Sequence, residues 1–122
     1  MKNGKVKIDI TQRTFDFAVR IVKLCQHLDE QSGVARTIGW QLLRAGTAIG
    51  SNMEEAQAAQ GRPDFMSKCG IALKAARETL YWLRLIVAAE ILPALRLSDI
   101  QKEADEIAKI VGAIIVSTKG RV

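Results

Sequence analysis

The stretch that decides the fold is residues 35–60, which read ARTIGWQLLRAGTAIGSNMEEAQAAQ. Apolar residues recur there at steps of three and four, the period of an amphipathic helix with one buried stripe. That stripe comprises Ile38, Leu42, Ala45, Ile49, Met53 and Ala56. Gly46 and Gly50 lie one turn apart on one face, where each costs about 1 kcal/mol against alanine. We therefore expect a helix that a neighbouring helix approaches closely at these glycines.

Three more helical segments flank this one. Gly61-Arg62-Pro63 breaks the chain before a segment over residues 63–92, and proline suits the first turn of a helix. An earlier segment covers residues 11–30, and a last one covers residues 98–119, where Ser98 and Gln101 have the spacing of a capping box. The predicted core stripe of the first segment is Phe15, Ala18, Val22, Cys25 and Leu28, widened by Ile21.

Four amphipathic segments joined by short breaks predict an all-α fold, an antiparallel up-down-up-down four-helix bundle. No segment alternates apolar and polar residues long enough to indicate a sheet. The expected helices are about 11–30, 35–60, 63–92 and 98–119, in one domain over residues 1–122. Residues 110–116 are apolar around most of the helix circumference. A monomer cannot cover all of that surface, which predicts a homo-oligomer with contacts through the last two segments.

Composition narrows the class of protein. The chain has 122 residues, 48% of them hydrophobic and 25% charged, as in ordinary globular domains. No apolar run approaches the roughly 20 residues that span a bilayer, and none follows the basic first residues as in a secretion signal. We therefore expect a cytoplasmic protein without a membrane partner. Cys25 and Cys69 are then expected to be buried free thiols.

Few residues suggest catalysis or metal binding. Bundle di-iron sites need Glu-x-x-His pairs, but the single histidine, His27, follows Leu24 at that spacing. Residues 46–52 lack the lysine and preceding strand of a phosphate-binding loop. The sequence thus predicts no enzyme activity, no metal and no cofactor. One group of polar residues is predicted to form a buried structural network, with carboxylate-pair catalysis as the alternative; it comprises Arg44, Asn52, Glu55 and Glu78.

Two basic surfaces are candidates for binding nucleic acid. The net charge is +5, from 18 Lys+Arg and 13 Asp+Glu, which suggests an anionic partner. The N-terminal face comprises Lys2, Lys5, Lys7, Arg13, Arg20 and Lys23, and we expect it to be the slightly favoured surface. The second surface is a stripe with spacing i, i+3, i+7 and i+10: Lys74, Arg77, Tyr81 and Arg84. Cations around an aromatic ring are typical of RNA-binding surfaces, but a solvated face or a subunit contact would have the same pattern.

Several blocks, in this order, resemble the bacterial four-helix bundle family of 23S rRNA intervening-sequence proteins. The blocks are TAIGSNMEEA at 47–56, DF at 64–65, IALK at 71–74 and ETLYWL at 78–83. The resemblance implies an antiparallel four-helix bundle that assembles as a tapered homopentameric ring. It also implies kinship with the accessory protein of diversity-generating retroelements, which works with a reverse transcriptase. No catalytic residues are known for this family.

These observations together predict a non-enzymatic oligomeric bundle. Its expected partners are further copies of itself and either RNA or a protein that handles nucleic acid, such as a reverse transcriptase. The alternative is a structural or protein-interaction module that binds no nucleic acid.

Overall fold

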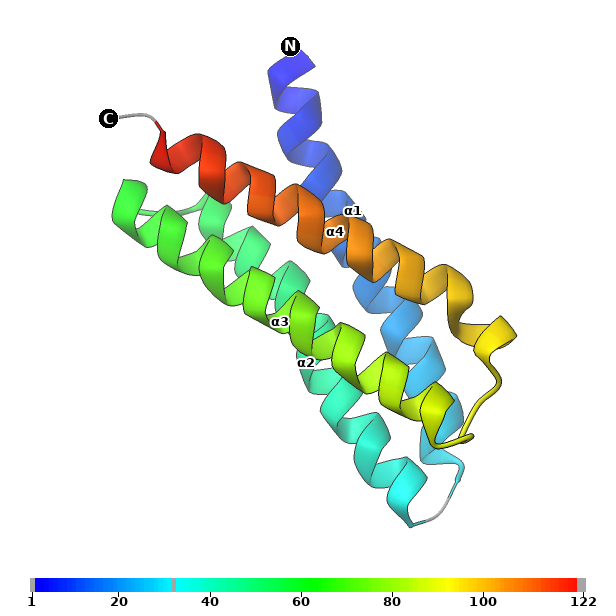
Figure 1. The fold of residues 1–122 in the computed structure, drawn as a ribbon. Coiled ribbons are helices and arrows are strands. Elements are labelled where there is room, and N and C mark those ends of the chain that lie inside the picture. Colours follow the sequence, from blue (N-terminus) through cyan, green and yellow to red (C-terminus); the bar gives the residue numbers. More distant parts are fainter. Residues whose placement is uncertain (1, 32, 121–122) are drawn as a thin grey trace.

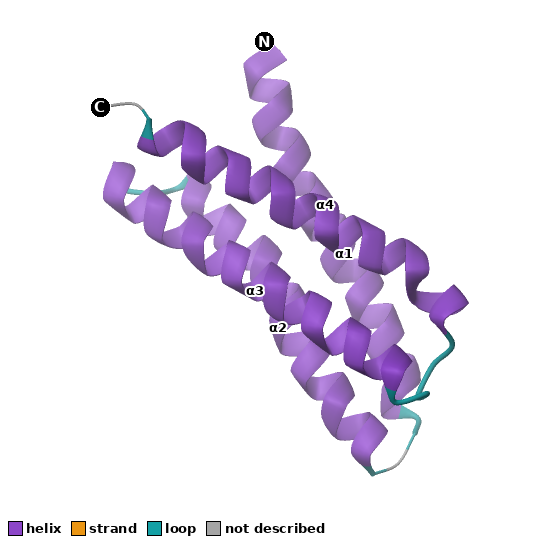
Figure 2. Cartoon of the chain, viewed as in Figure 1, coloured by secondary structure: helices purple, strands orange, loops and turns teal. Residues whose placement is uncertain are grey.

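A computed structural model describes the backbone of residues 2–31 and 33–120 and the side chains of residues 10–31 and 33–120. These residues form four helices and no strand (Figure 2). The helices are α1 (Lys2–Asp29), α2 (Val34–Gln57), α3 (Arg62–Ala88) and α4 (Ala94–Lys119). Consecutive helices run antiparallel and pack side by side, so the predicted all-α four-helix bundle is confirmed (Figure 1).

The core is one hydrophobic cluster to which all four helices contribute. The stripe predicted on α2 is confirmed, because its residues from Leu42 to Ala56 are buried and only Ile38 is partly exposed. The largest fully buried side chains include Phe17, Ile21, Leu28, Leu42, Ile49, Met53, Leu83, Ile86, Leu97 and Ile107.

Glycines on α2 set the distance to α1, as the sequence predicted. A β-carbon added at Gly46 would lie 2.8 Å from two side-chain carbons of Ile21, and one at Gly50 would lie 3.1 Å from the carbonyl oxygen of Thr14. The first distance is shorter than any ordinary carbon–carbon contact. The absence of a side chain therefore lets the α2 backbone approach the Ile21 side chain at Gly46 and the α1 backbone at Gly50.

The stripe predicted on α1 is partly wrong. Cys25, Leu28 and Ile21 are buried as expected, but Phe15 and Val22 are 55% and 39% exposed. Phe17 is buried in their place. Buried Thr14, on the same face as Phe17, satisfies its own hydroxyl by donating to the carbonyl oxygen of Thr11 at 3.0 Å. The helix carries apolar residues on two adjacent faces, and the close approach of α2 buries the face that contains Ile21.

Four helix boundaries differ from the expected ones by three or more residues. α2 ends at Gln57 rather than near residue 60. α1 begins at Lys2 rather than near residue 11. α3 ends at Ala88 rather than 92, because Glu90 adopts a left-handed conformation with φ of 61° and the amide of Ile91 then donates to the carbonyl of Ile86 at 3.0 Å. α4 begins directly after Pro93, so the capping box expected at Ser98 is wrong.

The contact between α1 and α4 is the smallest of the four between helices. The first turns of α1 extend beyond the bundle and diverge from α4 (Figure 1). Arg13 of α1 joins the two helices by hydrogen bonds to Glu103 and Glu106 of α4.

Candidate nucleic-acid interface

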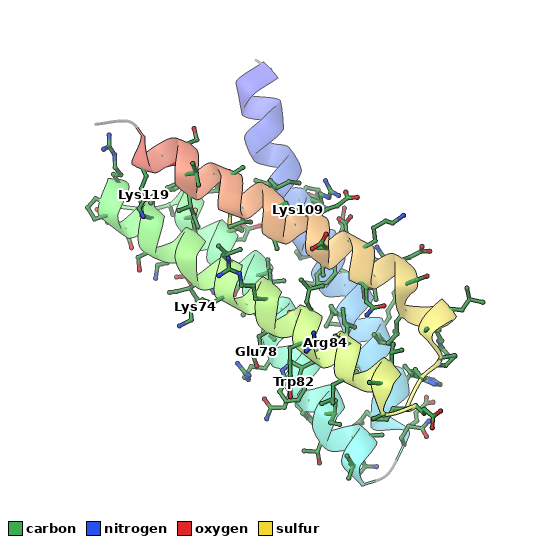
Figure 3. The ribbon with its side chains drawn as sticks, viewed as in Figure 1. Lys74, Glu78, Trp82, Arg84, Lys109 and Lys119 are labelled. Atoms are coloured by element: carbon green, nitrogen blue, oxygen red, sulfur yellow. The ribbon has the colours of Figure 1, made fainter. Side chains whose placement is uncertain are left out.

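The outer face of α3 carries the stripe of cations that the sequence predicted. Lys74, Arg77 and Arg84 are exposed, and no ion pair among the described residues engages any of them. Lys74 and Arg84 project from this helix in Figure 3. The only carboxylates of α3 are Asp64 and Glu78. The positive charge of this stripe is therefore available to an anionic partner.

Tyr81 of this stripe forms an aromatic pair with the adjacent Trp82. The Tyr81 side chain is 49% exposed, and its ring meets that of Trp82 edge to face, with centroids 5.0 Å apart and an interplanar angle of 75°. The Trp82 Nε1–H donates to Glu78 Oε2 at 2.9 Å. Arg44 of α2 donates to the same carboxylate oxygen. This chain of contacts ties the aromatic pair on α3 to the neighbouring helix.

The hydrogen bond from Trp82 is the largest cause of a lowered pKa of Glu78; burial opposes it, and the pairing with Arg44 lowers the pKa further. Glu78 is thus ionised at neutral pH and its charge is compensated by Arg44. For that reason it cancels little of the charge on Lys74, Arg77 and Arg84. Glu78 and Trp82 lie on one side of α3, one turn apart (Figure 3).

The structural network predicted around Arg44 is only partly present. Arg44 and Glu78 meet, but the Glu55 carboxylate pairs with Lys68 Nζ at 3.0 Å instead. Asn52 donates to the carbonyl of Ala48 on its own helix at 2.8 Å. The Arg44 and Glu55 side chains are 61% and 59% exposed, so the expectation of a buried network is wrong. All these groups lie at the α2–α3 edge, where water solvates them.

One predicted cation of the N-terminal face, Arg13, is engaged in ion pairs within the protein. Arg13 Nε and Nη2 donate to the two carboxylate oxygens of Glu103 at 2.6 and 2.8 Å. The same Nη2 donates to Glu106 at 2.6 Å. These hydrogen bonds raise the pKa of Arg13 and hold the pKa of Glu103 below its usual range, with a smaller contribution from Arg20. Arg13 therefore links α1 to α4 rather than facing solvent alone.

The other members of the N-terminal face are placed unequally. Arg20 and Lys23 are exposed on α1. The side chains of Lys2, Lys5 and Lys7 lie outside the described residues.

The remaining candidate groups are possible metal ligands and the two cysteines. Within the described part of the chain, no three His, Cys, Asp or Glu side chains gather as metal ligands do. Cys25 and Cys69 are buried free thiols, and burial raises the pKa of Cys25 to about 11. Cys25 borders a groove of about 150 Å³ between α1 and α2, which Val22, Trp40 and Leu43 also line. Over the described residues, no helix combines the length and apolar character needed to cross a membrane.

Comparison with known proteins matches residues 6–113 to the family described as 23S rRNA-intervening sequence protein. The chain belongs to this family. It is also similar to a crystal structure, at 1.70 Å, of a protein with unknown function from the S23 ribosomal protein family of Bacteroides thetaiotaomicron VPI-5482. The two chains are 40% identical with a TM-score of 0.81, over 87% of this chain and 97% of that one. No protein of curated function matched the sequence.

Sequence reasoning missed two features of this 23S rRNA-intervening sequence protein. The hydrogen bond from Trp82 to Glu78 could have been found from the sequence, because residues four apart on a helix are neighbours. The ion pair of Arg13 has no local sequence signal, since its partner Glu103 is 90 residues away.

Proposed function

We propose that this family member is a non-enzymatic, oligomeric bundle that binds RNA through the outer face of α3. The observation that carries the proposal is the set of exposed cations Lys74, Arg77 and Arg84 around the half-exposed ring of Tyr81. Phosphate-contacting cations beside a stacking ring are the usual components of a single-strand binding surface. The family's name refers to an rRNA intervening sequence, which agrees with an RNA partner.

The face of α3 is preferred over the N-terminal face for an electrostatic reason. Arg13 donates all its described hydrogen bonds to Glu103 and Glu106, so a phosphate would have to compete with two carboxylates for it. Arg77 and Arg84 have no such competitor among the described residues. This reverses the slight preference that the sequence suggested.

The proposal also covers the assembly of the protein and a partner protein. The family resemblance supports a homopentameric ring and a nucleic-acid-handling partner such as a reverse transcriptase. In a ring of identical subunits the α3 faces would repeat, and weak contacts from each would add through multivalency. A modest charge per chain would then suffice for tight binding.

Salt-dependent RNA binding tests the function. Binding of a labelled RNA is followed by fluorescence anisotropy over a range of salt concentrations. Each phosphate neutralised contributes about −0.7 to the log–log slope for a single strand, so three cations per subunit give about −2. The paired substitutions Arg77→Glu and Arg84→Glu should weaken binding and flatten the slope.

The matched control changes the charge equally at two other exposed arginines, Arg62→Glu with Arg96→Glu, at opposite ends of the bundle. A third variant, Arg20→Glu with Lys23→Glu, tests the N-terminal face while leaving Arg13 in place. If this third variant alone abolishes binding, the site assignment to α3 is wrong.

A protein-interaction module is the second candidate, favoured by the groove between α1 and α2. Val22 and Trp40, which line that groove, are 39% and 61% exposed, more apolar surface than an isolated chain needs to present. If the protein binds no RNA even at low salt, this alternative is supported and the proposed RNA-binding function is wrong.

A further inference from the structure

Tyr81 is an exposed aromatic side chain with a second ring packed beside it. The Tyr81 side chain is 49% exposed, and its ring packs edge to face with the Trp82 ring at a centroid distance of 5.0 Å. Trp82 is itself fixed by its hydrogen bond to Glu78, and Glu78 is fixed by Arg44 from α2. Two helices therefore cooperate to orient one ring that remains open to solvent.

Cations surround that ring along the helix axis. Arg77 precedes Tyr81 by four residues and Arg84 follows it by three, so both are its neighbours on the helix surface. From Lys74 to Arg84 the helix rises about 15 Å. A stacked strand that advances about 3.4 Å per nucleotide would place about four nucleotides over this length.

This arrangement suits an unpaired strand and not a duplex. In a duplex the bases stack on each other, and the protein reaches only phosphates, sugars and groove edges. A ring on the convex surface of a helix can stack only on a base that is already free of its partner. Any base has a face to offer, so such stacking is tolerant of sequence.

We propose that Tyr81 is a stacking platform for an unpaired RNA base, and that Trp82, Glu78 and Arg44 are the positioning residues that set its ring. Lys74, Arg77 and Arg84 contact the phosphates on either side. The inference rests on the proposed function and adds the class of ligand, single-stranded RNA bound with little sequence preference.

The experiment compares one RNA without self-complementarity, alone and annealed to its complement. Tyr81→Ala should weaken binding of the single strand roughly 5- to 150-fold, the equivalent of about 1–3 kcal/mol for one stacked base. Its salt slope should stay that of the unmodified protein, because no ion is released by stacking. Tyr81→Phe should bind nearly as well as the unmodified protein.

Phe15→Ala is the matched control, since it removes a ring of similar exposure from α1. It should leave RNA affinity unchanged. Arg77→Ala, unlike Tyr81→Ala, should reduce the magnitude of the salt slope by about 0.7.

The positioning role has its own readout. Glu78→Ala and Glu78→Gln remove the same charge and leave Arg44 unpaired alike, so their salt slopes should match. Glu78→Ala should nevertheless bind the single strand more weakly than Glu78→Gln, whose amide oxygen still accepts from Trp82. In a Trp40→Phe background, Trp82 is the one remaining tryptophan of the sequence. Its fluorescence should change on adding the single strand and not on adding the duplex.

The outcomes separate this inference from the function on which it rests. If no RNA binds at low salt, the proposed function and the stacking site both fail. If RNA binds with the expected salt slope but Tyr81→Ala matches the unmodified protein, or the duplex binds as tightly as the single strand, the stacking site is wrong and RNA binding stands. Circular dichroism of each variant confirms that the bundle has folded.

Discussion

At the scale of single residues, Gly46 controls the α1–α2 contact. Gly46→Ala would place a methyl group 2.8 Å from carbons of Ile21, whose buried β-branched side chain has little freedom to move. Overpacking typically costs about 1–3 kcal/mol, against a helix-propensity gain of about 1 kcal/mol for alanine. We expect a net loss of stability of about 1 kcal/mol, or roughly 4 °C in melting temperature.

Gly70→Ala provides the comparison for that experiment. Nothing lies within 4 Å of a β-carbon at Gly70, so the propensity gain should appear alone and raise the melting temperature. Equal effects from the two substitutions in thermal melts would show that Ile21 accommodates the added methyl group.

Glu78 and Glu55 should differ in what their removal costs. Glu78→Ala deprives the Trp82 N–H of its acceptor and Arg44 of its partner, and unpartnered, partly buried groups cost about 1–2 kcal/mol. Glu55→Ala breaks only its solvent-exposed pair with Lys68 and should stay within about 0.5 kcal/mol. Urea unfolding measures both. A loss of several kcal/mol for Glu55→Ala would indicate a burial that the isolated chain does not have.

At the scale of helices, Arg13 fastens α4 to α1. Arg13→Met keeps much of the side-chain stem but removes the hydrogen bonds to Glu103 and Glu106. Because the group is partly exposed, we expect a loss of about 1 kcal/mol at neutral pH. Lys109→Met, which breaks an exposed pair with Asp105 within α4, should cost less than half as much.

The effect of Arg13→Met should depend on pH in a defined direction. Arg13 lowers the pKa of Glu103 in the folded state, so this stabilisation is complete above the unfolded pKa, about 4.3, and is lost as the pH falls through the folded value. The melting difference between the two proteins should therefore shrink below about pH 4. A difference of the same size at pH 3 and pH 7 would assign the effect to packing of the side chain.

Helix existence and pairing were predictable from sequence, whereas the phase of α1 was not. On α2 the apolar residues occupy one face, so period alone identifies the core. On α1, Phe15 and Val22 form one apolar face and Phe17 and Ile21 another. The choice between them depends on Gly46 and Gly50 of α2, which no local pattern reveals.

Only those features of the candidate site that depend on neighbouring residues of one helix were predictable from the sequence. The stripe from Lys74 to Arg84 follows from helical spacing, and its exposure agrees with that reading. The fate of Arg13 depended on Glu103, far away in sequence, and was therefore beyond spacing arguments. The end of α3 was missed because Glu90, and not a glycine, takes the left-handed conformation.

At the scale of the whole molecule, the fold redistributes the charge of the chain. The basic segment of α1 meets the acidic segment of α4 through Arg13, Glu103 and Glu106, so part of each charge is cancelled internally. Lys74, Arg77 and Arg84 of the α3 stripe take part in no ion pair among the described residues. Of the cations behind the net charge of +5, those of the α3 stripe therefore stay available to an anionic partner, whereas Arg13 is neutralised within the bundle.

The last helix offers the test of assembly. Val116 is 71% exposed, and Ile110, Ile114 and Ile115 are only partly buried near the end of α4. We expect the protein to sediment as an oligomer at micromolar concentration, with this surface in the contact. Val116→Lys should shift it toward a species of 13.4 kDa, because a charge placed in an apolar contact lacks solvent and partner.

Lysine near a helix C-terminus agrees with the helix dipole, so Val116→Lys should not destabilise the folded subunit. Leu95→Lys is the control, because Leu95 is 89% exposed at the opposite end of the same helix. It gains the same charge in the first turn, where the dipole opposes it slightly, and should nevertheless leave the oligomer intact. Dissociation by Leu95→Lys but not by Val116→Lys would move the contact to the other end of the bundle, and a monomeric unmodified protein would exclude assembly altogether.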